Sequence, residues 1–307
     1  YRRQRQMCIR DRFQLLDHLG IDTLYASVGS SMGGMLSIAA AHLFRERVGR
    51  VISISGCARS APSGIALRYA QRSVLMADEN WNRGFYYGPN QVQPHKGMKL
   101  ARQIATITYR SGPEWEQRFG RRRHAQLTTE AEAATQRSPA LCPDFLVETY
   151  LDHQGEQFCL KYDANSLIYI SKAMDLFDMT DDALAELGAA RMEAHGDDGN
   201  LPVERIDHAP ASPKRRPHIT TISHPGAHAY VPSLARGLRR LHDVPILILG
   251  VQSDILFPVE QQRELAECIR MNGNTSVMYY EIDAPHGHDS FLIDVANVGG
   301  AIKGFLN

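Results

Sequence analysis

The chain has 307 residues, of which 43% are apolar, so it is long enough to bury a sizeable core in one large domain or a domain with a subdomain. Its 34 basic and 34 acidic side chains balance to a formal net charge of zero, which gives no indication of a polyanionic partner such as nucleic acid. No apolar run approaches the ~20 residues that a membrane-spanning helix needs, so we expect no membrane partner.

Five cysteines are scattered along the chain without C-x-x-C spacing: Cys8, Cys57, Cys142, Cys159 and Cys268. This pattern argues against a disulfide framework and a zinc site, and it fits a reducing compartment. We therefore expect no metal site and a cytoplasmic location, with a mitochondrial location as the alternative if the source is a fungus.

The first twelve residues, YRRQRQMCIRDR, contain five arginines and little apolar periodicity. They lack the apolar segment of a signal peptide. They resemble a translated sequencing adapter joined to a gene fragment, so we expect an artefactual or truncated start. A helix is predicted only after this stretch, over residues 13–19.

The strongest chemical signal follows. A short apolar run ending at Val28 predicts a strand, residues 29–33 match G-x-S-x-G, and a helical pattern begins at once. Strand, turn and helix in this order are typical of a nucleophile elbow, with Ser31 as the nucleophile. Ser30 is the rival, but Val28 would then occupy the place of the first glycine. We expect both glycines of the motif to relieve close contacts at the turn.

Residues 49–56 predict the next buried parallel strand, because β-branched residues alternate with small ones. From 62 to 185 the pattern is mainly helical, with prolines at the starts and breaks. We interpret this block as a helical lid over an active site. The helices predicted within it are 63–78, 98–109, 143–154 and 165–177.

Residues 186–239 are mostly polar and rich in proline and glycine, and they predict a flexible surface insertion. Four of the histidines in this range could suggest a metal site, but they are irregularly spaced and lack thiol companions, which argues against one. They are His195, His208, His218 and His224.

Alternating elements return with a strand over 244–251, a helix over 259–271 and a strand over 276–282. This order predicts a parallel sheet with its functional residues at the carboxyl ends of the strands. Asp254 follows the first of these strands, and two histidines, His286 and His288, follow the second.

A serine hydroxyl needs a neighbouring base, and that base needs a carboxylate to orient it. Asp254 is the favoured carboxylate, because Asp243 precedes its strand and lies at the wrong end of the sheet. Asp283 is interpreted as a turn residue. The residues alone do not decide between His286 and His288 as the base.

Several motifs together resemble the homoserine O-acetyltransferase (MetX-like) family of the α/β-hydrolase fold. The resemblance covers nearly everything from about residue 12 onward, apart from the polar insertion. It implies an α/β-hydrolase core in 1–61 and 240–307 with its first strands missing, a lid in 62–185 and an insertion in 186–239. The motifs are 29–34, 97–102, 107–110, 162–166, 252–258 and 287–292.

The resemblance implies that Ser31, Asp254 and His288 form a catalytic triad, which favours His288 over His286. The backbone N–H of Met32 would supply one oxyanion donor. The second donor would come from a loop upstream of the elbow, which this sequence does not contain.

The resemblance also places Arg102, Tyr109 and Asp289 near the substrate. Arg102 is suited to the carboxylate of an amino acid and Asp289 to its ammonium group. Tyr109 can donate a hydrogen bond.

The implied reaction is a ping-pong transfer of an acetyl or succinyl group from an acyl-CoA to the hydroxyl of L-serine or L-homoserine, without a bound cofactor. Residues 55–60, 110–120 and 141–145 look most like members that acylate L-serine for cysteine synthesis. A homodimer through the lid helices is also implied. The alternatives are an esterase with the same triad, or an inactive fragment lacking part of its oxyanion hole.

Overall fold

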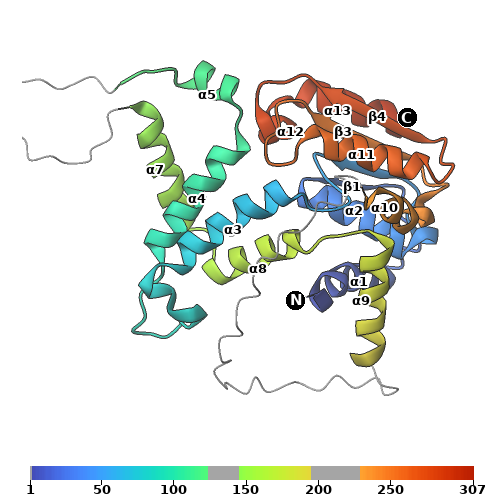
Figure 1. Ribbon diagram of the computed structural model, residues 1–307, viewed down its shortest axis with the longest axis horizontal. Coiled ribbons are helices and arrows are strands. Elements are labelled where there is room, and N and C mark those ends of the chain that lie inside the picture. The colour runs from blue at the N-terminus through green and yellow to red at the C-terminus, as the bar shows by residue number, and fades with distance from the viewer. Residues whose placement is uncertain (1, 124–144, 195–228) are drawn as a thin grey trace, which may run out of the picture.

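A parallel β-sheet lies at the centre of the computed structural model, which describes residues 2–123, 145–194 and 229–307 (Figure 1). Within these ranges the sheet has four strands in the order β1-β2-β3-β4. All neighbouring pairs are parallel, so the carboxyl ends of the strands share one edge, as the sequence predicted. The strands are β1 Ser27–Ser30, β2 Val51–Ile54, β3 Ile246–Val251 and β4 Val277–Ile282.

The two central strands, β2 and β3, are buried along their whole length because both faces of the sheet are covered. Helices α2 (Met32–Leu43) and α11 (Val259–Arg270) share one apolar cluster with Ile246. Helix α13 (Val295–Leu306) packs on the opposite face, in the cluster that contains Leu247. The sheet is therefore the middle layer of three.

Strand β1 lies at the edge of the described sheet and pairs only with β2. Its residue Val28 is 49% exposed, whereas all four residues of β2 are buried. No residue of β1, the strand that leads into the predicted nucleophile, is buried.

The arginine-rich opening is helical, which corrects the prediction of a helix over 13–19 alone. Helix α1 spans Arg2–His18. Arginine and glutamine lose little side-chain freedom in a helix, and Ile9 and Phe13 lie one turn apart on its buried side. The ring of Phe13 stacks on that of Phe44, with ring centroids 3.9 Å apart.

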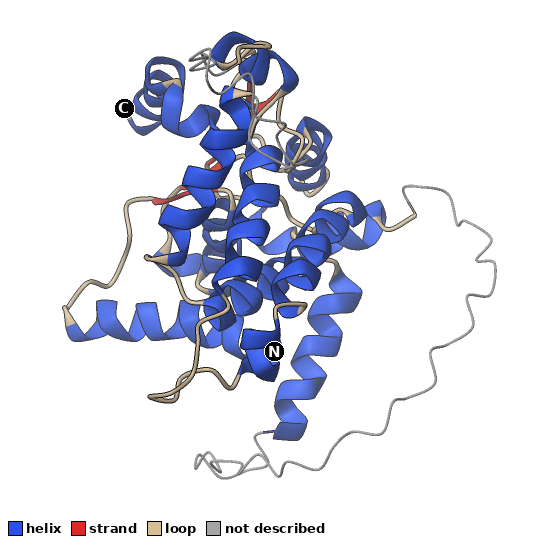
Figure 2. Ribbon diagram, turned by 90° about the vertical axis from the view of Figure 1, so that its left-hand side faces the viewer, coloured by secondary structure: helices blue, strands red, loops and turns tan. Residues whose placement is uncertain are grey.

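Helices dominate the chain between β2 and β3 (Figure 2). Helices α3, α4 and α7 form an arm that extends away from the sheet, with α4 packed against both of the others (Figure 1). The predicted helices of this region are found with bounds shifted by a few residues. They are α3 Pro62–Met76, α4 His95–Tyr109, α7 Leu146–Cys159 and α8 Ala164–Asp175. A further short helix that the sequence did not predict, α5, spans Gly112–Arg118.

One helix extends into the range 186–239 that the sequence predicted as a flexible insertion, and another lies inside it. Helix α9 spans Asp181–Ala194, with two aspartates in its first turn, and α10 spans Val231–Gly237, with a proline in its first turn. Leu234 of α10 is fully buried. Residues 195–228, which contain the four histidines considered above, lie outside the described residues.

The site is completed by short elements after β4. A 3-10 turn, η4 (Gly287–Asp289), is followed by α12 (Ser290–Ile293) and then α13. None of the helices in the three described ranges combines the length and the apolar character needed to span a bilayer.

Candidate active site

Ser31 occupies the sharp turn between β1 and α2. Its backbone has φ 54° and ψ −123°, in the positive-φ region that residues with a side chain rarely adopt. Its N–H donates to the carbonyl of Ile54 at 2.8 Å, and its carbonyl accepts from the N–H of Met35 at 3.2 Å. These bonds hold the strained turn that the G-x-S-x-G pattern predicted.

The glycines of the motif do not contribute equally. A Cβ on Gly29 would lie 2.2 Å from the carbonyl carbon of Gly33, so Gly29 is required for the close approach of backbone to backbone. A Cβ on Gly33 would meet nothing within 4 Å, which corrects the expectation that both motif glycines relieve contacts. Gly34 relieves one instead, because a Cβ there would lie 2.7 Å from Oγ of Ser53 in β2.

Three side chains from separate strand ends meet above the sheet edge. Oγ of Ser31 lies 2.8 Å from Nε2 of His288, and Nδ1 of His288 lies 2.6 Å from Oδ2 of Asp254. The other oxygen of Asp254 accepts the N–H groups of Leu256 and Phe257, both at 2.9 Å. The carboxylate is therefore fixed, and it favours the tautomer that places the proton of His288 on Nδ1 and leaves Nε2 facing Ser31.

Aromatic rings enclose His288, which is 4% exposed. Phe257 stacks on the imidazole with centroids 5.1 Å apart, and Phe291 meets it edge-on at 5.4 Å. Such apolar surroundings hold the ring in one orientation and strengthen its electrostatic interaction with Asp254.

The positions of the side chains distinguish the candidate base and carboxylate from the alternatives that the sequence offered. His286 contacts Glu114 at 2.5 Å through its Nδ1, and it is His288 that reaches Ser31. Asp243 pairs with Arg45 at 2.7 Å, before β3 rather than after it. Asp283 is exposed.

Arg102 and Tyr109 lie together on α4. The guanidinium of Arg102 lies over the rings of Tyr109 and Phe158, at 5.5 and 4.8 Å from their centroids, and its buried Nε has no hydrogen-bond partner among the described residues. The ring of Tyr109 is 6.2 Å from that of His288. Burial raises the pKa of Tyr109, so its hydroxyl keeps its proton at neutral pH.

Asp289 follows the histidine directly, but it is not a free carboxylate. Its Oδ2 lies 3.2 Å from Nε of Arg110. Burial raises the pKa of Asp289, and the positive charges of Arg110 and neighbouring groups act in the opposite direction. Sequence reasoning assigned no role to Arg110. The available signal was its position directly after Tyr109, with Glu114 four residues later.

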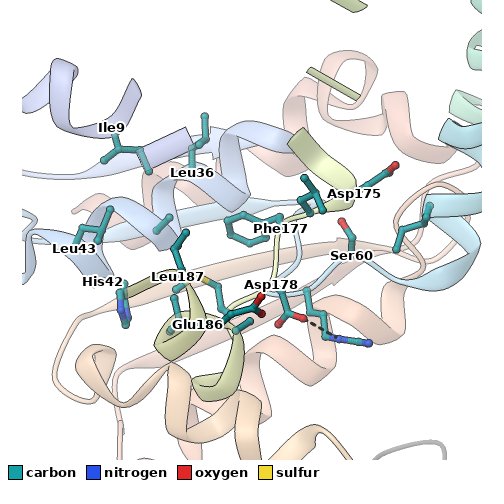
Figure 3. Close-up of a pocket in the computed structure, with 17 residues that line it drawn as sticks. Ile9, Leu36, His42, Leu43, Ser60, Asp175, Phe177, Asp178, Glu186 and Leu187 are labelled. Carbon is teal, nitrogen blue, oxygen red and sulfur yellow. Dashed lines mark ion pairs between the residues drawn. The ribbon is translucent and has the colours of Figure 1, made fainter. Parts of the chain in front are cut away.

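A cavity of about 310 Å³ lies at a different place, between α1, α2 and the chain from α8 to α9 (Figure 3). Its walls are mainly apolar, with contributions from Ile9, Leu36, Phe177 and Leu187. His42 also lines it, and burial together with nearby arginines lowers the pKa of His42 to about 4. None of the three residues that meet at Ser31 lines this cavity.

Comparison with known proteins agrees with this geometry. The profile of the alpha/beta hydrolase fold family matches residues 8–295. Serine O-succinyltransferase of Emericella nidulans is 52% identical over 97% of this chain and 58% of its own length. The enzyme of the same name from Schizosaccharomyces pombe is 48% identical over 97% and 60%. Homoserine O-acetyltransferase of Carboxydothermus hydrogenoformans is 30% identical over 96% and 62%.

Solved structures share the fold at low sequence identity. Homoserine O-acetyltransferase from Bacillus anthracis superposes with a TM-score of 0.69 at 20% identity, over 98% of this chain and 64% of its own. Esterase E22 does so with a TM-score of 0.67, also at 20% identity, over 97% and 65%. The chain thus belongs to the α/β-hydrolase fold family. Within that fold it is similar in sequence to serine and homoserine O-acyltransferases, and it spans 58–62% of the length of the three curated relatives described above.

Proposed function

We propose that the chain carries the catalytic centre of a serine O-acyltransferase that transfers an acyl group from an acyl-CoA to the hydroxyl of L-serine or L-homoserine. The contact between Ser31 and His288 at 2.8 Å, with Asp254 behind the ring, is the observation that carries this proposal. The relatives at 52% and 48% identity support L-serine as the acceptor and succinyl-CoA as the donor.

In the first half of the reaction, Oγ of Ser31 attacks the thioester carbonyl and passes its proton to Nε2 of His288. Asp254 stabilises the resulting imidazolium. The tetrahedral intermediate collapses, the C–S bond breaks, and the leaving sulfur takes the proton from His288. The products are free CoA thiol and an acyl ester on Ser31.

Backbone donors stabilise the oxyanion of that intermediate. Met32 is the first residue of α2, so its N–H has no carbonyl of an earlier helical turn as a partner. The positive end of the helix dipole adds to the field at the same place. Met32 is therefore our proposed oxyanion donor.

In the second half, the hydroxyl of the amino acid loses its proton to Nε2 of His288 and attacks the acyl ester. The ester bond to Ser31 breaks, Oγ recovers the proton, and the O-acyl amino acid leaves. Arg102 is the proposed partner of the substrate carboxylate, Asp289 of its ammonium group, and Tyr109 a hydrogen-bond donor.

We also propose that the region over residues 62–185, which includes the helical arm, acts as a lid that excludes water and as the contact between two copies of the chain. Exposed apolar side chains on α3 and α4 support the second role: Tyr69 is 63%, Leu100 47% and Ile107 45% exposed. Light scattering on the purified protein should give the mass of a dimer, and a monomer at micromolar concentration would contradict this.

A four-way incubation tests the reaction. The protein is mixed with acetyl-CoA or succinyl-CoA and with L-serine or L-homoserine, while released thiol and acylated amino acid are measured. We expect thiol release that depends on the amino acid, with L-serine preferred, and no release by the Ser31→Ala variant. Thioester hydrolysis that neither amino acid changes would instead indicate an esterase.

A further inference from the structure

Four charged or titratable side chains form a continuous chain beside the catalytic histidine. Nδ1 of His286 lies 2.5 Å from Oε2 of Glu114. The other oxygen of Glu114 lies 2.7 Å from a terminal nitrogen of Arg110, and Nε of Arg110 lies 3.2 Å from Asp289. The chain begins two residues before His288 and ends one residue after it.

The backbone of the same two segments is also in close contact. Oγ of Ser111 accepts the N–H of Glu114 at 3.2 Å and donates to the carbonyl of Pro285. Gly287 has φ 64°, and a Cβ there would lie 2.8 Å from the carbonyl oxygen of Tyr109. The turn between α4 and α5 is therefore docked on the turn that carries His288.

Glu114 is the central member of this chain. It is 7% exposed, and both of its carboxylate oxygens are engaged, one by Arg110 and one by His286. The ion pair between Glu114 and Arg110 fixes one end of the Arg110 guanidinium, while Nε of that guanidinium contacts Asp289. A guanidinium that is only 12% exposed and held between two carboxylates has little freedom to rotate, because each contact is charge-assisted.

We propose that Glu114 is a positioning residue that acts through Arg110 to fix Asp289 for the ammonium group of the amino-acid substrate. The inference rests on the proposed function. The ion pair with Arg110 uses Oδ2 of Asp289, so we assign the other oxygen, Oδ1, to the ammonium group. Glu114 itself does not contact the substrate.

The two half-reactions separate this role from a purely structural one. Forming the acyl-enzyme requires no amino acid, so the Glu114→Gln variant should acylate Ser31 at the wild-type rate. The KM for the amino acid should rise roughly 10-fold or more, which corresponds to the loss of one charge-assisted hydrogen bond. The kcat at saturating amino acid should change less than KM.

Two further variants complete the test. Arg110→Lys keeps the positive charge but cannot hold both carboxylates in the same fixed geometry, so it should raise KM in the same direction. Glu281→Gln is the matched control, because Glu281 on β4 likewise accepts two hydrogen bonds from an arginine, Arg263 of α11, and contacts none of the four residues of this chain. It should leave KM unchanged.

A second readout does not require turnover. A serine-directed phosphonate labels Ser31, and a bound amino acid should protect it from labelling. We expect Glu114→Gln and Arg110→Lys to need roughly 10-fold more L-serine for half-protection than the wild type and Glu281→Gln.

The outcomes distinguish the two proposals. If L-serine protects the wild type and both variants equally, with equal KM values, the positioning role is wrong and the proposed function stands. If acyl-enzyme formation falls as much as KM rises in both variants, Glu114 acts on the whole fold and the inference is overturned. Absence of both protection and acyl transfer in the wild type would overturn the proposed function itself.

Discussion

Ser31 and His288 are 257 residues apart in the chain, yet Nε2 of one lies 2.8 Å from Oγ of the other. Their strands are not neighbours, because β2 and β3 separate β1 from β4. At ~4.8 Å per strand, the two strand ends are about 14 Å apart. The turn that contains η4 therefore carries His288 back across the sheet edge, over the loop after β3 that supplies Asp254.

The carboxylate behind His288 should be essential. Asp254→Asn keeps the shape of the side chain but can present an N–H to Nδ1, which favours the wrong imidazole tautomer. We expect turnover of an activated ester to fall by about 10⁴-fold with little change in melting temperature. Asp243→Asn, on a carboxylate before β3, should keep wild-type turnover. Loss of less than about tenfold in Asp254→Asn would contradict the assignment.

The two glycines of the elbow motif should respond differently to the same substitution. Gly29→Ala places a Cβ 2.2 Å from the backbone of Gly33, which cannot be accommodated without moving the turn. We expect the free energy of unfolding to fall by about 3 kcal/mol. Gly33→Ala meets nothing and lies in a helix, so it should be neutral or up to ~1 kcal/mol more stable. Denaturant titrations of both variants measure these free energies of unfolding. An equal loss of stability in the two variants would refute the different roles of the two glycines.

Arg102 should be needed for the amino acid but not for the acyl donor. Arg102→Lys keeps the charge and loses the planar group that lies between two rings. We expect a KM for the amino acid roughly 10-fold higher, and unchanged acylation of Ser31. Arg118→Lys is the control, because Arg118 also lies over two rings, at 5.4 and 4.5 Å. Equal KM values in the two variants would exclude the proposed role.

A buried ion cluster should support the base of the helical arm. Asp175 contacts Arg68 at 2.6 Å and Arg72 at 2.5 Å, and all three side chains are at least 93% buried. Asp175→Asn would leave two buried guanidinium groups without a counter-charge and should cost about 3 kcal/mol of stability. Asp243→Asn breaks a pair whose carboxylate is 52% exposed and should cost less than ~1 kcal/mol. Chemical denaturation of the two variants provides the measurement.

His42 should make stability depend on pH. Its pKa is about 4 in the folded chain and 6.5 when unfolded, so between these values the unfolded state binds a proton that the folded state does not. The free energy of unfolding is therefore unaffected by the titration of His42 above pH 6.5. It falls as the pH drops from 6.5 toward 4, by about 3 kcal/mol at most. His42→Gln should flatten this part of the melting curve against pH. His242→Gln, on an exposed ring, should not.

Much of the fold was predictable because apolar runs and glycine turns are local signals. The run in β3 is continuous and apolar, and the parallel order follows from the helices between strands. Ser31 was predictable because its strained backbone needs Gly29 nearby, and Asp254 because it follows a strand.

The remaining features depend on tertiary contacts. The pairing of Arg110 with Asp289 joins α4 to the turn after β4, and no spacing in the sequence encodes it. The helix over the first residues was missed because its arginine-rich opening has little apolar periodicity, whereas Ile9 and Phe13 are buried by contacts with the rest of the fold. The place of Gly34 against Ser53 likewise depends on how closely α2 approaches β2.

Because β1 is an edge strand of the described sheet, we expect the site to open at a lower free energy than the core of the molecule. Within the part of the chain that the structure describes, Ser27–Ser30 exchange ladder hydrogen bonds with one neighbour, while β2 and β3 are held from both sides. Amide protons of β1 should therefore exchange with solvent through small local openings long before those of β3. Because Ser31 follows β1 directly, mild denaturant will misalign the nucleophile while the hydrophobic core remains folded.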